Sequence, residues 1–181
     1  STTCGGVCTG LGVAPSRVGK VFGIFKAYCT RVGAGPFPTE LFDATGTQLR
    51  EQGNEYGATT GRPRRCGWLD LVALKYAIMI NGVTDIALTK ADVMSNFDTI
   101  NICTAYKVDG QVVTQMPSSS DAEIEPIYTP LKGWKEDISK CSTYDELPQA
   151  FKDYIRFIEE ETGTKISIVS VGPDRTATIF R

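Results

Sequence analysis

The chain has 181 residues, 41% of them hydrophobic and 22% charged, which is typical of one folded globular domain spanning residues 1–181. Its 19 Lys and Arg residues against 21 Asp and Glu residues give a net charge of −2, which provides no overall positive field and disfavours nucleic acid as the main partner. No apolar stretch approaches the roughly 20 residues that span a bilayer, which excludes a membrane-embedded class.

Histidine is absent, which excludes imidazole bases, Ser-His or Cys-His nucleophiles and histidine metal ligands. The six cysteines are scattered singly, without a CxxC pair, at positions 4, 8, 29, 66, 103 and 141. We interpret them as reduced thiols of a cytoplasmic protein, with zinc binding through Cys4 and Cys8 as the less favoured alternative. Residues 1–3 carry neither an initiator methionine nor a signal-peptide pattern, so we expect the sequence to be a piece of a longer one.

The first third of the chain is rich in glycine and weak in periodic patterns. Residues 4–12 contain four glycines and predict a loop. Apolar residues recur at helical spacing over 16–25 and predict a helix, and residues 26–32 predict a strand that ends in a turn at 33–36. The long irregular stretch from there to Arg65 is where we expect ligands to bind, because loops of this length are usually functional.

The middle of the chain has stronger signals. Residues 69–80 predict an apolar helix, buried on most of its surface and ended by the Asn-Gly pair that starts at Asn81. A short strand is predicted at 84–89. Segments 99–108 and 111–115 flank an Asp-Gly pair, which predicts a β-hairpin.

The last third of the chain alternates between strands and a helix. Residues 125–131 contain two prolines and predict at best an edge strand. Apolar residues at helical spacing over 147–158 predict an amphipathic helix that ends at Gly163. Strands are predicted at 166–171 and 176–181. The fold class that follows is α/β, a mixed sheet with flanking helices and a β-hairpin excursion.

One polar segment has the chemistry of an anion-binding loop, and it reads Thr59-Thr60-Gly61-Arg62-Pro63-Arg64-Arg65. Guanidinium groups bind carboxylates or phosphates through two parallel hydrogen bonds, and Pro63 stiffens the tip of the loop. The segment therefore indicates a ligand with planar anionic groups. The alternative is a solvated basic loop.

Two further segments follow predicted strands, at the edge where ligands gather in open α/β sheets. The first is Thr89-Lys90-Ala91-Asp92 and the second is Ser170-Val171-Gly172-Pro173-Asp174-Arg175. A carboxylate at Asp92 suits the paired N–H donors of guanine, while the stem of Lys90 covers the face of the base. A helix N-cap at Asp92 and a plain turn at Gly172 are the alternatives.

Other catalytic patterns are missing from the sequence. A phosphate-binding P-loop is excluded at Gly19-Lys20, because Val21 stands where the pattern needs Ser or Thr and Ala14 where it needs glycine. Acidic runs at 145–146 and 159–161 are interpreted as the solvated face and ends of a helix.

Taken together, four segments resemble adenylosuccinate synthetases nearly end to end, in their order and spacing. They are residues 30–40, residues 53–70, Thr89-Lys90-Ala91-Asp92 and Gly172-Pro173-Asp174-Arg175. The resemblance covers only the C-terminal two-fifths of such an enzyme. It implies a homodimeric, cytoplasmic ligase of AMP biosynthesis that joins IMP to L-aspartate, using GTP as a substrate and Mg²⁺.

The resemblance also implies roles for individual residues. Residues 58–62 would form the aspartate-binding loop, comprising Ala58, Thr59, Thr60, Gly61 and Arg62. Arg62 would also approach IMP, Val32 would touch the IMP ribose through its backbone, and Arg64 would lie between aspartate and GTP. The guanine pocket would be formed by Lys90, Ala91, Asp92, Ser170, Val171, Gly172 and Pro173. Ala91 departs from the family, in which leucine is frequent at this position.

The family's phosphate loop, catalytic base, Mg²⁺ ligands and histidine acid belong to its N-terminal portion, so we expect no catalytic or metal-binding residue in this chain. We expect the chain alone to be inactive and to need that portion as a partner. Two alternatives stay open. One is a stand-alone module that binds a purine nucleotide or a dicarboxylate. The other, disfavoured by the net charge, is an RNA-contacting domain that uses Arg62, Arg64 and Arg65.

Overall fold

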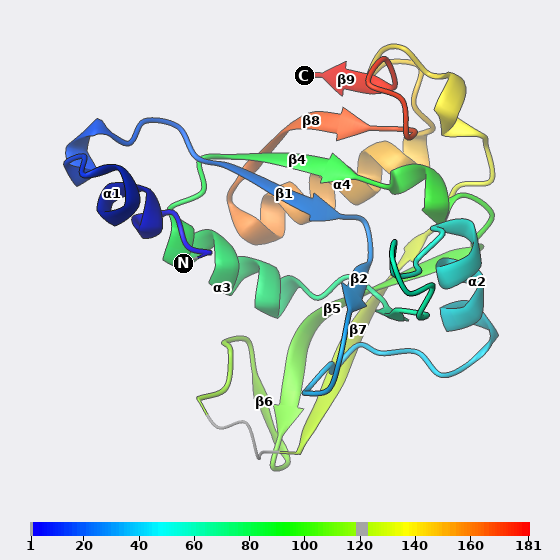
Figure 1. The fold of residues 1–181 in the computed structure, drawn as a ribbon. Coiled ribbons are helices and arrows are strands. Elements are labelled where there is room, and N and C mark those ends of the chain that lie inside the picture. Colours follow the sequence, from blue (N-terminus) through cyan, green and yellow to red (C-terminus); the bar gives the residue numbers. More distant parts are fainter. Residues whose placement is uncertain (1, 119–122) are drawn as a thin grey trace.

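The computed structural model describes residues 2–118 and 123–181. Its helices, shown in Figure 1, are α1 (Gly5–Leu11), α2 (Ala44–Gln52), α3 (Leu71–Asn81) and α4 (Gln149–Thr162), with short 3₁₀ turns η1 (Pro15–Arg17), η2 (Ala91–Met94) and η3 (Ile138–Lys140). Its strands are β1 (Phe22–Lys26), β2 (Cys29–Arg31), β3 (Arg65–Gly67), β4 (Asp85–Thr89), β5 (Thr99–Val108), β6 (Gln111–Val113), β7 (Ile124–Lys132), β8 (Lys165–Ser170) and β9 (Thr178–Phe180). Among these described residues, no helix is both long and apolar enough to cross a membrane.

The main sheet has the strand order β1-β4-β8-β9. Strands β1, β4 and β8 run parallel, and β9 runs antiparallel to β8, which confirms the predicted mixed α/β sheet. The register pairs Lys26 with Thr89 and Leu88 with Val169, so the carboxyl ends of the three parallel strands lie at one edge of the sheet. Figure 1 shows α4 running behind β4 and β8.

The predicted hairpin is confirmed as part of a second, antiparallel sheet with the order β6-β5-β7. It projects away from the main sheet in Figure 1. Strand β7 is an edge strand in this sheet, as its prolines predicted. A separate antiparallel ladder joins β2 to β3 and pairs Arg31 with Arg65.

The core forms where α4 packs on the main sheet. The buried face of α4 consists of Phe151, Tyr154, Ile155 and Ile158, the stripe that the helical spacing predicted. Trp134 packs on Phe151 with their ring centroids 4.5 Å apart. Burying a side chain of this kind contributes about 1.5–3 kcal/mol, so these contacts hold α4 against the core.

Two predictions for the start of the chain are wrong. Residues 4–12 contain helix α1, whose first turn is tied to the end of α3 by the Cys4 N–H donating to Asn81 Oδ1 at 2.8 Å. The helix predicted over 16–25 is only the turn η1 followed by strand β1. Glycines weaken a helix here, and pairing with β4 favours the extended form. A Cβ at Gly23 would lie 3.0 Å from the Val83 side chain, so glycine permits this close packing.

Two further expectations need correction. The stretch expected to be irregular contains α2, which begins because the Asp43 carboxylate accepts hydrogen bonds from the backbone of Thr45 and Gly46. Helix α3 is confirmed, with Asp70 as its N-cap and Gly82 as its C-cap, but it is not buried on most of its surface. Exposed apolar side chains on this helix are Tyr76, Met79 and Ile80.

Candidate functional site

The two strand-end segments predicted to form a base pocket leave the main sheet at the same edge. Asp92 lies four residues after Leu88, and Pro173 lies four residues after Val169, the β-ladder partner of Leu88. Figure 1 shows β4 and β8 ending side by side. The structure therefore brings together the segments that carry Asp92 and Pro173, and an arrangement on opposite sides of the sheet would have contradicted the prediction.

The Asp92 side chain is half-buried in the first turn of η2. The N-cap of η2 is Lys90, in the left-handed region at φ 59°, and no side-chain hydrogen bond caps this turn. The alternative prediction of an N-cap at Asp92 is therefore wrong. The Asp92 carboxylate forms no hydrogen bond or ion pair within residues 2–118 and 123–181, so it is free to accept hydrogen bonds from a ligand.

The charged end of Lys90 faces the protein. Its Nζ donates to the Gly53 carbonyl at 2.5 Å and lies 3.5 Å from Glu55 Oε1. Gly53 follows the last residue of α2, so Lys90 ties the end of β4 to the end of α2. This arrangement leaves the aliphatic stem of Lys90 for contact with a ligand.

The second strand end is held by its own hydrogen bonds. The Ser170 hydroxyl donates to the Gly172 carbonyl at 3.0 Å. Val171 is buried, as is Ala91 at the neighbouring strand end, so these two residues reach a ligand only through their backbone. Pro173 is exposed. The turn after it is closed by the Asp174 carboxylate, which accepts from Thr176 N at 2.8 Å and from its hydroxyl at 2.7 Å.

Residues 56–63 form a closed loop with an exposed tip. An isolated bridge joins Tyr56 to Pro63, and the Gly57 N–H donates to the Arg62 carbonyl at 2.8 Å. Gly61 adopts φ +65°, a conformation that favours glycine, and its N–H donates to the Gly57 carbonyl at 2.8 Å. The exposed residues of the tip are Ala58, Thr59, Thr60, Gly61 and Arg62. The loop thus presents two hydroxyls and a guanidinium to solvent.

The three arginines of this segment differ in what they contact. Arg62 is exposed, and its guanidinium has no ion pair with any residue that the structure describes. Arg64 Nη1 contacts Glu55 Oε2 at 2.5 Å. Arg65 Nε contacts both oxygens of Glu40 at 2.9 Å, and its Nη1 donates to two backbone carbonyls of the turn at 33–35. A cluster of three guanidiniums available to one ligand is therefore wrong, and the basic patch suggested for RNA contact is largely used within the fold.

Val32 lies beside this loop. The β2–β3 ladder pairs Arg31 with Arg65, and Val32 is the first residue after β2. Its side chain is 70% exposed. The ladder therefore ends at Arg31 and Arg65, one residue before Val32 and one residue after Arg64.

Glu55 is a buried carboxylate that the sequence did not single out. It is 0% exposed and accepts hydrogen bonds from Lys26 Nζ at 2.8 Å, Tyr28 Oη at 2.6 Å and Arg64 Nη1 at 2.5 Å. Burial alone would raise the pKa of Glu55, but the hydrogen bonds from Lys26, Tyr28 and Arg64 outweigh it and lower the pKa from 4.5 to about 2. No local pattern marks Glu55, because Lys26 and Tyr28 come from a distant part of the chain.

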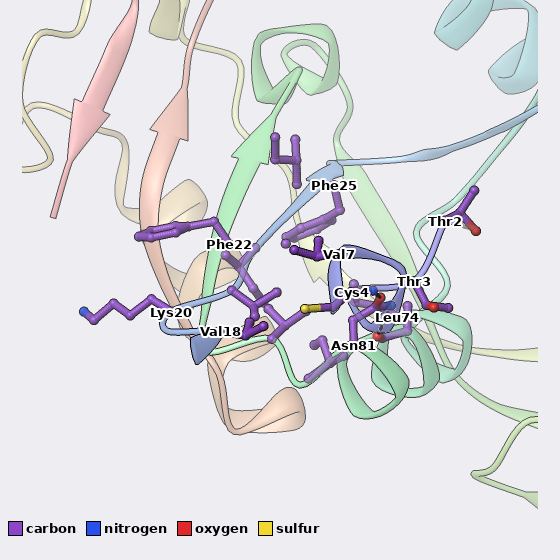
Figure 2. Close-up of a pocket in the computed structure, with 17 residues that line it drawn as sticks. Thr2, Thr3, Cys4, Val7, Val18, Lys20, Phe22, Phe25, Leu74 and Asn81 are labelled. Atoms are coloured by element: carbon purple, nitrogen blue, oxygen red, sulfur yellow. Dashed lines mark hydrogen bonds between the residues drawn. The ribbon is translucent and has the colours of Figure 1, made fainter. Parts of the chain in front are cut away.

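A cavity among the described residues lies away from these segments. Figure 2 shows a pocket of about 630 Å³ between α1, β1 and α3, lined largely by apolar side chains such as Phe22, Phe25 and Leu74. Its lining includes Cys4 but none of the residues predicted to bind aspartate, IMP or GTP. We favour the carboxyl edge as the site, because its polar groups match a ligand and the pocket's lining does not.

Acidic and cysteine side chains are common ligands of metal sites. Within residues 2–118 and 123–181, no three or more cysteine, aspartate or glutamate side chains lie close enough to hold a metal ion. The six cysteines are free thiols.

The sequence profile of the adenylosuccinate synthetase family matches residues 1–179. The adenylosuccinate synthetase of Bacteroides thetaiotaomicron is 59% identical over 181 residues, which are 100% of this chain and 43% of that protein. A structure of fully ligated adenylosuccinate synthetase from Plasmodium falciparum superposes with a TM-score of 0.95 at 46% identity, covering 99% of this chain and 44% of the other. Succinoaminodeoxyadenylate synthetase of cyanophage S-2L shares the fold, with a TM-score of 0.55 at 19% identity. The chain thus spans less than half the length of these relatives.

Proposed function

This chain belongs to the adenylosuccinate synthetase family, and we propose that it supplies the guanine-recognition and aspartate-binding elements of such an enzyme. The reaction joins IMP to L-aspartate to give adenylosuccinate, while GTP is converted to GDP and phosphate. One observation carries the proposal. The free carboxylate of Asp92 and the turn at Pro173 leave the sheet at one edge.

We assign guanine recognition to the carboxyl edge of the main sheet. The Asp92 carboxylate accepts the N1–H and N2–H donors of guanine, a pair that adenine lacks. The stem of Lys90 covers one face of the base, because its amine is held by Gly53. The remaining wall of the pocket consists of Ala91, Ser170, Val171, Gly172 and Pro173.

We assign the carboxylates of L-aspartate to the loop at 56–63. The loop tip presents the hydroxyls of Thr59 and Thr60 and the guanidinium of Arg62, which has no protein partner in the described residues. Backbone groups of Ala58 and Gly61 complete this subsite. Arg62 also approaches IMP, Val32 contacts the IMP ribose through its backbone, and Arg64 lies between aspartate and GTP.

We infer that the rest of the catalytic machinery lies outside this chain. The catalytic base, the histidine acid, the phosphate loop and the Mg²⁺ ligands would come from the additional length that its relatives carry, and a homodimer is the expected assembly. No cluster of three or more acidic or cysteine side chains occurs within residues 2–118 and 123–181, which supports placing the Mg²⁺ ligands in that additional length. Strand β1, at the edge of the main sheet, exposes Phe22 and Ile24 beside the apolar pocket, which supports a covering segment of the longer enzyme there.

A chimera tests this proposal. The chain replaces the matching segment of the Bacteroides thetaiotaomicron relative, and formation of adenylosuccinate from IMP, L-aspartate and GTP is followed by absorbance. We expect turnover by the chimera and none by the 181-residue chain alone. A folded but inactive chimera, or turnover by the isolated chain, would contradict the proposal. Submillimolar binding of GDP by the isolated chain, lost in Asp92→Ala, would instead favour a stand-alone binding module.

A further inference from the structure

Building on the proposed function, we propose that Glu55 is a positioning residue that couples the aspartate-binding loop to the guanine pocket. Its carboxylate holds the base of the loop at 56–63 and the end of β4 in a fixed relation. Binding at one site then favours the geometry needed at the other.

The contacts of Glu55 come from three separate segments of the chain. Oε1 contacts Lys26, the last residue of β1, together with Tyr28 in the connection to β2, and lies 3.5 Å from Lys90 after β4. Oε2 contacts Arg64, at the base of the loop. One side chain with no exposed surface therefore joins the ends of two neighbouring strands to the loop.

The backbone of Glu55 also sits at this junction. The Glu55 N–H donates to the Arg50 carbonyl of α2 at 2.8 Å, and its carbonyl accepts from the Arg64 N–H at 2.9 Å. These bonds do not depend on the side chain. Removing the carboxylate therefore takes an ion-pair partner from Arg64 and from Lys90, while the course of the backbone and the hydrogen bond from Lys90 to the Gly53 carbonyl are retained.

The charge of Glu55 matters more than its volume. Three cations surround this single carboxylate, from Lys26, Arg64 and Lys90. Without the negative charge, the three cations repel one another in a partly buried site and move toward solvent. Arg64 is the most affected, because Glu55 is its ion-pair partner and the loop ends at the residue before it.

A matched control separates positioning from simple stabilisation. Tyr106 Oη donates to Asp70 Oδ2 at 2.5 Å, a buried pair that joins the hairpin sheet to the start of α3. The hydrogen bonds of this pair, in which Asp70 accepts from Ala73 N and Tyr106 Oη, involve neither Glu55 nor the loop at 56–63. Tyr106→Phe therefore removes a buried hydrogen bond without touching the proposed coupling.

The test compares Glu55→Gln with Tyr106→Phe in the chimera. We expect Glu55→Gln to raise the KM for L-aspartate and the KM for GTP by about tenfold, with a smaller change in kcat, because typical couplings between sites span about 5-fold to 150-fold. Hydrogen exchange is expected to quicken selectively at the amides of Gly57 and Gly61. Tyr106→Phe should lower the melting temperature and leave both KM values unchanged.

The proposal on Glu55 is overturned if Glu55→Gln changes the KM values and the loop exchange no more than Tyr106→Phe does. If Glu55→Gln does not fold, Glu55→Asp replaces it in the test. Aspartate keeps the negative charge but is shorter by one methylene, so its carboxylate lies farther from Arg64 and Lys90. Both KM values should still rise together. Hydrogen exchange at Gly57 and Gly61 tests the proposal on Glu55 even if the chimera is inactive. Turnover by the unmodified chimera tests the proposed function, independently of the exchange measurement on Glu55→Gln.

Discussion

Acidification should weaken the fold through Glu55. Its folded-state pKa of about 2 lies below the ordinary value of 4.5, so its contribution to stability is complete above pH 4.5. That contribution is lost as the pH falls from about 4.5 to about 2. The gap between the two pKa values corresponds to about 3 kcal/mol of unfolding free energy at about 1.4 kcal/mol per pH unit.

Glu55→Gln isolates this effect, because glutamine is a neutral side chain of the same size. Other acids with lowered pKa values, such as Asp137 and Asp174, are present in both proteins and cancel in the difference. We expect the unmodified chain to be more stable than the variant at pH 6, and this advantage to shrink by about 3 kcal/mol by pH 2.

Urea unfolding measures this difference, followed by the fluorescence of the buried Trp68 and Trp134 across the pH range. A difference between the two proteins that stays constant from pH 6 to pH 2, within about 1 kcal/mol, would refute the assignment of Glu55 as a carboxylate held ionised by its cations.

Two further substitutions test the loop and the junction below it. Arg62→Ala should raise the KM for L-aspartate of the chimera by about 10-fold to 100-fold with an unchanged melting temperature. Arg65→Ala should instead cost about 1–3 kcal/mol of unfolding free energy, because its contacts to Glu40 are lost. Calorimetry in which Arg62→Ala is destabilised and Arg65→Ala is not would contradict these roles. Gly53→Ala should destabilise the chain by about 1–3 kcal/mol, because the added Cβ would clash with the Tyr28 hydroxyl, and equal urea midpoints for the two proteins would contradict this.

Local signals explain which parts of the fold were predictable. Helix α4 has a clear apolar stripe, and Gly163 at φ 65° ends it as its position in the sequence predicted. Strand β1 was mistaken for a helix because its apolar residues fit a helical spacing. Its extended form comes from pairing with β4, about sixty residues away along the chain, as Lys26 with Thr89 illustrates.

In the candidate site, too, some residues were predictable from local sequence signals and others depended on contacts between distant segments. Asp92 and Pro173 were predictable because strand ends of parallel sheets meet at one edge. The sequence alone did not distinguish Arg62 from Arg65, since the difference depends on Glu40 lying opposite Arg65 in the folded chain. Glu55 was missed for a similar reason, because its partners Lys26 and Tyr28 become neighbours only when β1 joins the sheet.

Nucleotide selectivity of the chimera bears most directly on the proposed guanine pocket. We predict that GTP supports turnover and ATP does not, and that Asp92→Asn lowers kcat/KM for GTP by about 100-fold or more, because an amide cannot accept from both donors of guanine. An Asp92→Asn variant that keeps its full preference for GTP over ATP would show that Asp92 does not recognise the guanine base.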